Sequence, residues 1–555
     1  MAGRQYDSYH HLSNFLPQLI LLLVINVIVL CHCASPSIGR PNLVADAPSS
    51  AFIRSLESSI NAIQRVTSVV SRFTHIALHD FRLSNAVSDC LDLLEFSAQE
   101  LSWTLSAAQN PTGKDNSTGD VSSDLRTWLG AALGNQETCM EGFEGTNSLV
   151  KAAVAGGLDQ ITSLVRDVLA MLHPPARGGG GKGHDQRGRK RKLMMIKGND
   201  NTQGLGHGSA FPHWIRSKDR KLLQATGTPS MAADVVVAAD GSGNYTRVMD
   251  AVLEAPDYSS GRYIIYIKRG VYHENVEIKK KKWNLVMIGD GMDLTIITGN
   301  RSFVDGWTTF RSATFAAVGG RGFMARDMTF ENTAGPQKHQ AVALRSDSDL
   351  SVFYRCGVRG YQDTLYAHSL RQFYRECHIS GTVDFIFGDA TAVFQNCQIL
   401  AKRGLPNQKN TITAQGRRDP NQPSGFAIQF SNISADSDLL QSNTTTTTLI
   451  TYLGRPWKLY SRTIIMQSYI SSAVRPEGWL EWNGDFALDT LFYAEYLNYG
   501  PSAGLGSRVR WAGFHPLNDS SQAANFTVAQ FIDGNLWLPP TGVRYIAGLT
   551  RTQYL

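Results

Sequence analysis

Two aspartates of the chain, Asp363 and Asp384, occupy equivalent positions in neighbouring segments that are similar to each other. Each lies seven residues after a cysteine, Cys356 or Cys377, within an apolar run. Isolating a carboxylate in apolar surroundings costs on the order of several kcal/mol or protonates the group. Two carboxyl groups held close together split their proton affinities, so that one is protonated and the other ionised near neutral pH. The pair therefore has the chemistry of an acid beside a base or nucleophile.

Either aspartate alone could instead cap a turn or be neutralised by a nearby arginine. Three features favour a chemical role: the two residues share a phase, both lie in apolar runs, and a glycine precedes each, Gly360 and Gly381. The stretch GTVDFIFGDA, residues 381–390, otherwise has the pattern of a buried strand. We therefore expect Asp384 to place a functional carboxylate within that strand.

The segments that carry the aspartates belong to a repeat with a period near 20 residues. Three cysteines, Cys356, Cys377 and Cys397, mark it with spacings of 21 and 20 residues in β-rich sequence without helical crossovers. This period predicts the stacked coils of a parallel β-helix, in which equivalent residues of successive coils lie about 4.8 Å apart. The two carboxylates would then face each other. Cys377 could pair with either neighbouring cysteine, which would leave one thiol free.

The elements around this repeat differ along the chain, and 555 residues are too many for one ordinary core. Residues 50–173 are rich in Ala, Leu, Ser and Val at helical spacing, which predicts an all-α bundle of four antiparallel helices. Residues 174–224 form a basic, glycine-rich linker without periodicity. In residues 225–555, short β-runs separated by Gly and Asn predict an all-β domain.

The first 34 residues include an uncharged apolar run from Phe15 to Cys31, followed by small residues. This pattern is typical of a secretory signal peptide, and its length also permits an uncleaved signal-anchor. In both cases we expect the chain to enter the secretory pathway. Seven N-x-S/T sequons agree with that route and are candidate glycosylation sites: Asn116, Asn244, Asn300, Asn432, Asn443, Asn518 and Asn525.

Charge is distributed unevenly over these parts. Residues 1–176 contain 10 basic and 16 acidic residues, a net charge of −6. Residues 177–224 contain 12 basic and 3 acidic residues, a net charge of +9, and residues 225–555 contain 31 and 28, a net charge of +3. Opposite net charges favour docking of the helical part on the all-β part. Nucleic-acid binding is not expected.

Two short motifs point to other chemistries but lack the context that each requires. GGGGKG at 178–183 is similar to a phosphate-binding loop, yet Lys182 is followed by Gly183 rather than Ser or Thr, and no strand precedes it. Gly500–Gly504 fits the pattern G-x-S-x-G, but Pro501 lies in a glycine-rich loop rather than in a strand-turn-helix elbow. Neither nucleotide binding nor a serine esterase is expected.

Five sequence blocks resemble, in order, the signature blocks of plant pectin methylesterases: GVYHENV (270–276), QAVALR (340–345), GYQDTLY (360–366), GTVDFIFG (381–388) and YLGRPW (452–457). The resemblance covers nearly all of residues 231–549. It implies a right-handed parallel β-helix as the catalytic domain, in agreement with the repeat. It also implies hydrolysis of the C6 methyl esters of pectic homogalacturonan, with release of methanol and without a metal or organic cofactor.

The resemblance implies roles for individual residues. Asp384 corresponds to the nucleophile and Asp363 to the general acid, which later acts as base, while Arg455 keeps Asp384 ionised. The other implied residues contact the substrate or its transition state: Gln362 as the stabiliser of the oxyanion, Gln340 beside it, Thr309, and Trp457 as a platform for sugar stacking.

The helical part resembles the inhibitor-like pro-region that precedes many such enzymes. Cys90 and Cys139 correspond to one bridged cysteine pair of that pro-region, whereas a second pair is absent. RKRKLM at 189–194 is one candidate cleavage motif. FPHWIRSKDRKLLQ resembles the processing boundary more closely and contains the motif Arg220, Lys221, Leu222 and Leu223. We expect the helical part to cover the pectin groove until cleavage releases it.

Two rival functions remain open at this point. A galacturonan glycosidase or lyase on the same fold would need an acid against the glycosidic oxygen with a second carboxylate, or a basic proton abstractor, commonly with calcium. The chain could also be a catalytically silent pectin-binding wall protein. The amides beside the carboxylates favour an esterase, expected to be a monomer that acts on methyl-esterified homogalacturonan. Its own pro-region and separate inhibitor proteins are the other candidate partners.

Overall fold

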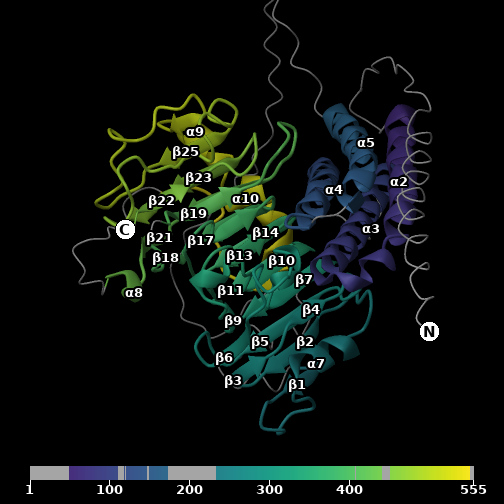
Figure 1. Ribbon diagram of the computed structural model, residues 1–555. Coiled ribbons are helices and arrows are strands. Elements are labelled where there is room, and N and C mark those ends of the chain that lie inside the picture. Colours follow the sequence, from purple (N-terminus) through teal and green to yellow (C-terminus); the bar gives the residue numbers. More distant parts are fainter. Residues whose placement is uncertain are drawn as a thin grey trace, which may run out of the picture.

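The computed structural model describes residues 49–110, 118, 120–146, 149–172, 233–406, 408–440 and 450–550. Helices make up most of the first part of these ranges, and short strands are the main regular elements of the second (Figure 1). The predicted signal peptide or anchor, the linker with its candidate cleavage motifs, Asn116 and Asn443 lie outside the described residues.

Four long helices form the bundle that the helical spacing predicts: α2 (Ser50–Ser71), α3 (Phe81–Gln109), α4 (Val121–Gly142) and α5 (Leu149–Met171), with a 3₁₀ turn η1 (Ile76–His79) after α2. Ser49, Asp80 and Asp120 cap three of the N-termini, because each side chain accepts a hydrogen bond from a backbone N–H of the first turn. Apolar side chains recurring every three or four residues bury one face of each helix. A disulfide between Cys90 and Cys139 joins α3 to α4, as the resemblance implies.

Three parallel sheets form the predicted β-helix, and most coils of the chain add one strand to each sheet. The eleven-stranded sheet contains β1 (Val235–Val237), β2 (Tyr263–Ile267), β5 (Leu285–Gly289), β8 (Met324–Arg326), β11 (Ser351–Tyr354), β14 (Arg371–Arg375), β17 (Thr391–Gln395), β20 (Gly425–Gln429), β23 (Arg462–Met466), β25 (Phe492–Tyr496) and β26 (Phe514–Pro516). The eight-stranded sheet contains β3 (Gly270–His273), β6 (Thr295–Gly299), β9 (Thr329–Asn332), β12 (Gly357–Arg359), β15 (His378–Gly381), β18 (Gln398–Ala401), β21 (Asn432–Ala435) and β24 (Tyr469–Ile470). The seven-stranded sheet contains β4 (Val276–Ile278), β7 (Phe315–Arg321), β10 (Leu344–Asp349), β13 (Leu365–Ala367), β16 (Ile386–Gly388), β19 (Asn410–Gln415) and β22 (Thr451–Gly454).

The cysteines of the repeat lie in adjacent coils, and none of them is bridged. Cys356, Cys377 and Cys397 are buried free thiols that directly precede β12, β15 and β18, whose first residues are in register. The expectation that Cys377 pairs with a neighbour is therefore wrong. Side chains that project in parallel stay about 4.8 Å apart, whereas a disulfide needs Cβ atoms roughly 3.5–4.5 Å apart. The Cys377 thiol donates instead to the backbone oxygen of Phe353 at 3.3 Å.

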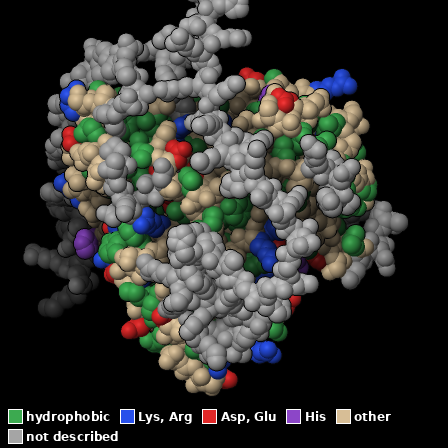
Figure 2. All heavy atoms as spheres, turned by 180° about the vertical axis from the view of Figure 1, so that it is seen from behind, with side chains coloured by type: hydrophobic (Ala, Val, Ile, Leu, Met, Phe, Trp, Pro, Cys, Tyr) green, Lys and Arg blue, Asp and Glu red, His purple; other side chains and the backbone are tan. Residues whose placement is uncertain are grey.

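Short helical segments complete the all-β part: α7 (Val248–Glu254), α8 (Ser437–Leu440), α9 (Ser520–Ala524), α10 (Val528–Phe531), α11 (Gly534–Trp537), η3 (Phe310–Ser312), η4 (Pro336–Lys338) and η5 (Pro539–Thr541). On the face drawn in Figure 2, basic and acidic side chains are scattered among hydrophobic and neutral ones. Among the described residues, no helix is both long and apolar enough to cross a membrane.

The bundle packs on the side of the β-helix formed by the seven-stranded sheet (Figure 1). One row of side chains runs across that sheet in register: Glu277, Ala316, Arg345, Tyr366, Phe387 and Ala414. Its apolar members share one buried cluster with side chains of the bundle helices. This packing holds the C-terminal end of α4 beside the turns that carry the two aspartates.

Candidate active site

The two aspartates lie in turns rather than in strands. Asp363 lies between β12 and β13 and Asp384 between β15 and β16, so residues 381–390 are not one buried strand as their pattern suggests. Both residues have a left-handed backbone, with φ of 61° and 52°, which costs a non-glycine residue about 1–2 kcal/mol. A Cβ on Gly381 would lie 2.3 Å from that of Phe385, so only glycine fits before the second turn. The Asp363 N–H donates to the Val383 carbonyl at 3.0 Å, which keeps the two turns stacked as the repeat predicts.

Asp384 is bound by residues from two later coils. Nε and Nη2 of Arg455 donate to its two carboxylate oxygens at 2.8 and 2.6 Å. The Thr411 hydroxyl donates to Oδ1 at 2.6 Å and accepts a hydrogen bond from the Asp384 N–H at 2.8 Å. A bidentate guanidinium offsets the cost of burying a carboxylate and fixes its orientation. Asp384 therefore has the environment of a positioned anionic nucleophile.

Asp363, one coil away, has a different environment. Its carboxyl group is buried and forms no hydrogen bond with any residue of the described ranges. Burial first, and then the charge of Asp384, raises the pKa of Asp363 well above its ordinary value of 3.8, although Arg455 opposes the shift. A protonated Asp363 beside an arginine-paired Asp384 is the combination of acid and anion that the two in-phase aspartates predict.

Both carboxyl groups line one cavity of about 300 Å³. The structure brings the other implied site residues to the same cavity: Thr309, Gln340, Gln362, Arg455 and Trp457. The side-chain amides of Gln340 and Gln362 form no hydrogen bond within the described part of the chain, so both can donate to a developing oxyanion. Trp457 is half-buried, and its ring centroid lies 5.9 Å from that of Phe387.

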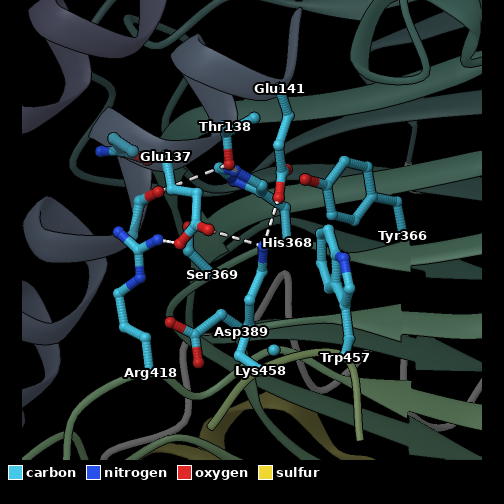
Figure 3. Close-up of a pocket in the computed structure, with 13 residues that line it drawn as sticks. Glu137, Thr138, Glu141, Tyr366, His368, Ser369, Asp389, Arg418, Trp457 and Lys458 are labelled. Atoms are coloured by element: carbon cyan, nitrogen blue, oxygen red, sulfur yellow. Dashed lines mark hydrogen bonds and ion pairs between the residues drawn. The ribbon is translucent and has the colours of Figure 1, made fainter. Parts of the chain in front are cut away.

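The bundle closes this cavity from the opposite side. Thr138, Glu141, Gly142 and Glu144, at the end of α4 and just after it, line the cavity together with the two aspartates. Figure 3 shows the Glu141 side chain reaching from α4 toward Lys458, beside Tyr366. Glu141 and Lys458 are 2.6 Å apart. The end of α4 therefore forms part of the wall of the cavity that contains the two aspartates.

Ion pairs between the bundle and the β-helix follow the predicted charge distribution. Among the described residues, one of these ion pairs has its base in the bundle: Arg166 pairs with Asp419. In every other such pair the bundle supplies the acid: Glu95 with Lys280, Asp89 and Asp92 with Arg311, Asp124 with Arg371, Glu137 with Arg418 and Lys458, and Glu141 with Lys458. The opposite charges thus meet across the interface.

Comparisons with known proteins agree with this arrangement. The sequence model of a family described as Pectinesterase matches residues 234–535. The chain belongs to the pectinesterase family. A second family model, described as Plant invertase/pectin methylesterase inhibitor, matches residues 33–171. The pectinesterase match covers the β-helix, and the inhibitor match covers the bundle.

Similar proteins carry both parts of this pectinesterase. It is 66% identical over 496 residues to Pectinesterase/pectinesterase inhibitor PPE8B of Prunus persica, a match that covers 89% of each chain. It is 63% identical over 508 residues to Probable pectinesterase/pectinesterase inhibitor 44 of Arabidopsis thaliana, which covers 90% of this chain and 94% of the other.

A solved structure resembles the β-helix of this pectinesterase without the bundle. Pectin methylesterase from Carrot matches with a TM-score of 0.56 and 55% sequence identity. The match covers 98% of the carrot chain and 57% of this one, which is the share that the β-helix occupies. The solved carrot chain is therefore a β-helix of this kind without a bundle attached to it.

Sequence reasoning missed two residues of the candidate site. The Trp482 ring lies 4.3 Å from the Arg455 guanidinium and also lines the cavity, and Thr411 binds Asp384. Trp482 belongs to the block PEGWLEW, whose tryptophans could have suggested a sugar platform. Nothing in the sequence near Thr411 marks it. In the described ranges, no group of three His, Cys, Asp or Glu side chains is arranged to hold a metal ion.

The remaining sequons of the pectinesterase lie at the surface, with one exception. Asn432 is partly buried in β21, and its amide donates to the side-chain oxygen of Gln398 at 2.8 Å. The exposed ones are Asn244, Asn300, Asn518 and Asn525. Glycosylation of all seven sequons stays a prediction, and these four are the most accessible of the described ones.

Proposed function

We propose that this pectinesterase hydrolyses the C6 methyl esters of pectic homogalacturonan in two steps. The Asp384 carboxylate attacks the ester carbon, and the carbonyl oxygen gains negative charge. The amides of Gln362 and Gln340 donate hydrogen bonds to that oxygen. Protonated Asp363 gives its proton to the departing methoxy group, which leaves as methanol, and an anhydride then joins Asp384 to the sugar acid.

In the second step Asp363 acts as base. It takes a proton from a water molecule whose oxygen attacks the C6 carbon of the anhydride. The bond to Asp384 breaks, the galacturonate leaves with a free carboxyl group, and both aspartates return to their first protonation states. Arg455 holds Asp384 in place throughout, while Trp457 and Thr309 position the sugar. No step needs a metal or an organic cofactor.

One observation carries this proposal: the two carboxyl groups of one cavity have unequal partners. Asp384 has a bidentate arginine, whereas Asp363 has none and a raised pKa. Two amides without hydrogen-bond partners beside them favour an oxyanion, which ester hydrolysis forms and glycoside hydrolysis does not. The presence of both aspartates, the arginine and the two amides in one cavity argues against a catalytically silent wall protein.

Methanol release tests this function against its rivals. The protein to assay is the freed β-helix, meaning the full chain cleaved in the linker and separated from the bundle. With methylated pectin it should release methanol and produce no new reducing ends. New reducing ends or unsaturated products would identify a glycosidase or lyase instead, and the absence of any product would support a silent binding protein.

A second part of the proposal concerns the bundle. We infer that it blocks the pectin groove until cleavage at the Arg220–Leu223 motif lets it leave. The position of Glu141 and Thr138 in the cavity supports this role. The full chain should release methanol more slowly than the freed β-helix, and high salt should narrow the difference because it screens the ion pairs. Equal rates at every salt concentration would leave the bundle with a chaperone or retention role.

The setting of this activity follows from the sequence. We propose that the chain is secreted to the cell wall as a glycosylated monomer and that separate inhibitor proteins can replace the bundle after cleavage. The apolar N-terminal run and the exposed sequons support secretion. Sedimentation of the secreted protein with and without deglycosylation would test the monomer and the glycans together.

A further inference from the structure

Thr411 contacts the turn of Asp384 through both its backbone and its side chain. It lies in β19, which pairs with β16, the strand that follows this turn. The Thr411 N–H donates to the Thr382 carbonyl at 3.2 Å, and the Phe385 N–H donates to the Thr411 carbonyl at 3.2 Å. Between these two bonds, the Thr411 hydroxyl contacts both the backbone N–H and the carboxylate of Asp384. The next coil thus holds the turn on either side of Asp384.

The Thr411 hydroxyl can donate in one direction only. A hydroxyl has one proton and two lone pairs. The Asp384 N–H can act only as a donor, and it lies 2.8 Å from the Thr411 oxygen, so it uses a lone pair of that oxygen. The hydroxyl proton is then directed to Oδ1 of Asp384, at 2.6 Å. Hydrogen bonds arranged in such a chain polarise one another, so the backbone N–H also acts on the carboxylate.

The two carboxylate oxygens of Asp384 are therefore not equivalent. Oδ1 accepts hydrogen bonds from the Thr411 hydroxyl and from Nε of Arg455, at 2.6 and 2.8 Å. Within the described ranges, Oδ2 accepts one hydrogen bond, from Nη2 of Arg455 at 2.6 Å. Because a carboxylate oxygen has about two lone-pair sites, those of Oδ1 are both used and one of Oδ2 stays free. A new bond to carbon needs a free lone pair.

We propose that Thr411 is a positioning residue that saturates Oδ1 of Asp384 and so makes Oδ2 the attacking oxygen. This role rests on the proposed function, in which Asp384 is the nucleophile. Thr411 is fully buried and does not line the cavity, so it acts through Asp384 and not on the substrate. A lone pair of Oδ2 forms the bond to C6, the bond from C6 to the methoxy oxygen breaks, and Asp363 supplies the proton of methanol.

The same hydroxyl has a further effect when the anhydride breaks down. In the anhydride, Oδ1 is a carbonyl oxygen without a full charge. Water attacks C6 and gives a proton to Asp363, the bond from Oδ2 to C6 breaks, and Asp384 becomes a carboxylate again. Hydrogen bonds to a charged acceptor are stronger than those to a neutral one, so the Thr411 hydroxyl favours the departure of this carboxylate. Thr411 should therefore matter more to the second step than to the first.

The alternative is that the hydroxyl only stabilises the left-handed turn of Asp384. Thr411→Val removes the hydroxyl and keeps the branched shape, whereas Thr411→Ser keeps the hydroxyl. The matched control is Thr413→Val. Thr413 is buried in the same strand and does not line the cavity, and its hydroxyl donates to the Leu453 carbonyl at 2.9 Å. Should Thr411→Val not fold, Thr411→Ala and Thr411→Ser form a pair that differs by the hydroxyl alone.

The experiment measures methanol release from methylated pectin by each variant. Melting temperatures of the uncleaved chain first show which variants fold, and each is then cleaved in the linker and separated from the bundle. Thr411→Val should lower kcat about tenfold to hundredfold with little change in KM, because a hydrogen bond to a charged group is lost. Thr411→Ser should stay within a few-fold of wild type. Thr413→Val should alter only the melting temperature.

Rapid mixing separates the two steps. The rate of the first methanol released per active site, divided by the rate of the later ones, should be higher in Thr411→Val than in wild type, because the second step is slowed more. An unchanged kcat would overturn the role of Thr411. An equal loss in Thr411→Val and Thr411→Ser, with the wild-type ratio in both, would overturn it too and leave a structural role. A wild type that releases no methanol would instead overturn the proposed function.

Discussion

Asp384 and Asp349 are both buried carboxylates that an arginine binds through two nitrogens, yet only Asp384 faces the cavity. Arg455 binds Asp384 at 2.8 and 2.6 Å, and Arg371 binds Asp349 at 3.0 and 2.6 Å. Asp349 also accepts a hydrogen bond from the indole of Trp128 of the bundle at 3.0 Å. Burial raises the pKa of Asp349, but Arg371 outweighs it, and the pKa lies below its ordinary value.

The difference between the two aspartates is in what surrounds the ion pair. A second aspartate near Asp349, Asp124 of the bundle, binds the same Arg371 at 2.7 Å, so the arginine lies between the two acids and satisfies both. Near Asp384, the second acid is Asp363, which has no arginine of its own. Burial and arginine pairing thus make a stable carboxylate, whereas an unpaired neighbouring acid and a cavity add what the proposed nucleophile needs.

The largest effect should come from exchanging these two carboxylates for amides. In the freed β-helix, Asp384→Asn should lower methanol release at least roughly 10⁴-fold, because an amide is no nucleophile. Asp349→Asn should instead lower the free energy of unfolding by about 1 kcal/mol or less and leave turnover per folded molecule unchanged, because removal of the bundle exposes Arg371 and an exposed ion pair contributes little. Methanol assays with denaturant melts on the same samples separate the two outcomes. Near-normal methanol release by Asp384→Asn would remove Asp384 from the nucleophile role.

The next effect concerns the acid of the pair. Asp363→Asn should slow methanol release by roughly 10²–10⁴-fold, since the leaving group then departs without a proton. Because the pKa of Asp363 is raised, wild-type kcat/KM should fall as the pH rises through that pKa and Asp363 loses its proton. In Asp363→Asn this decline should disappear. A variant that keeps the wild-type pH profile would show that another group titrates.

The stacking of the two acids could be predicted from the sequence because a repeat fixes which residues share a phase. A period of 20 or 21 residues puts Asp363 and Asp384 in adjacent coils whatever their local conformation. Their left-handed turns could not be predicted, since apolar flanks indicate a strand and give no information on φ. Thr411 and Trp482 reach the site from later coils, where loops of unequal length break the period. Their contacts are set by tertiary packing alone.

The docking of the bundle could be predicted only in part. Net charges of −6 and +3 predict attraction but do not say which groups meet. The burial of Arg371 between an acid of the bundle and one of the β-helix depends on how α4 lies on the sheet. The free cysteines are a different case, because their spacing predicts the adjacent coils but carries no information on whether their side chains can form a disulfide.

A third prediction uses two buried acids under the bundle, Asp347 and Asp389, that accept no hydrogen bond from an arginine of the described ranges. Burial raises the pKa of Asp347 to about 6 and that of Asp389 to about 7. The raised pKa of Glu100 on α3 has burial and then Asp347 as its causes. Each of these groups binds a proton when the bundle docks. Docking is therefore strongest at a pH below the ordinary pKa of a carboxyl group, and it weakens as the pH rises through about 6 to 7. Arg345 and His368 are the basic neighbours of Asp347, and the pKa of Asp347 is raised although Arg345 lowers it.

The measurement is the affinity with which the β-helix retains the bundle after the linker has been cleaved. Between pH 5 and pH 7 its affinity should fall roughly tenfold to hundredfold. Asp347→Asn should flatten this dependence, because neither oxygen of Asp347 has a hydrogen bond to lose. Asp327→Asn is the matched control, since Asp327 pairs with Arg355 of the β-helix. A bundle that binds more tightly at pH 7 would reverse the sign and show that the interfacial ion pairs dominate.

The smallest effect should come from applying the same comparison to tryptophans. Trp457 is half-buried and lines the cavity, whereas Trp479 is 1% exposed and packs against Tyr493, with the ring centroids 4.3 Å apart. In the freed β-helix, Trp457→Ala should lower kcat/KM for methylated pectin about tenfold through a higher KM, with little change in melting temperature, because a sugar loses its platform. Trp479→Ala should cost about 3–5 kcal/mol of stability and leave KM unchanged in the molecules that fold. Unfolding of Trp457→Ala would make Trp457 a packing residue like Trp479 and leave Trp482 as the aromatic platform of the groove.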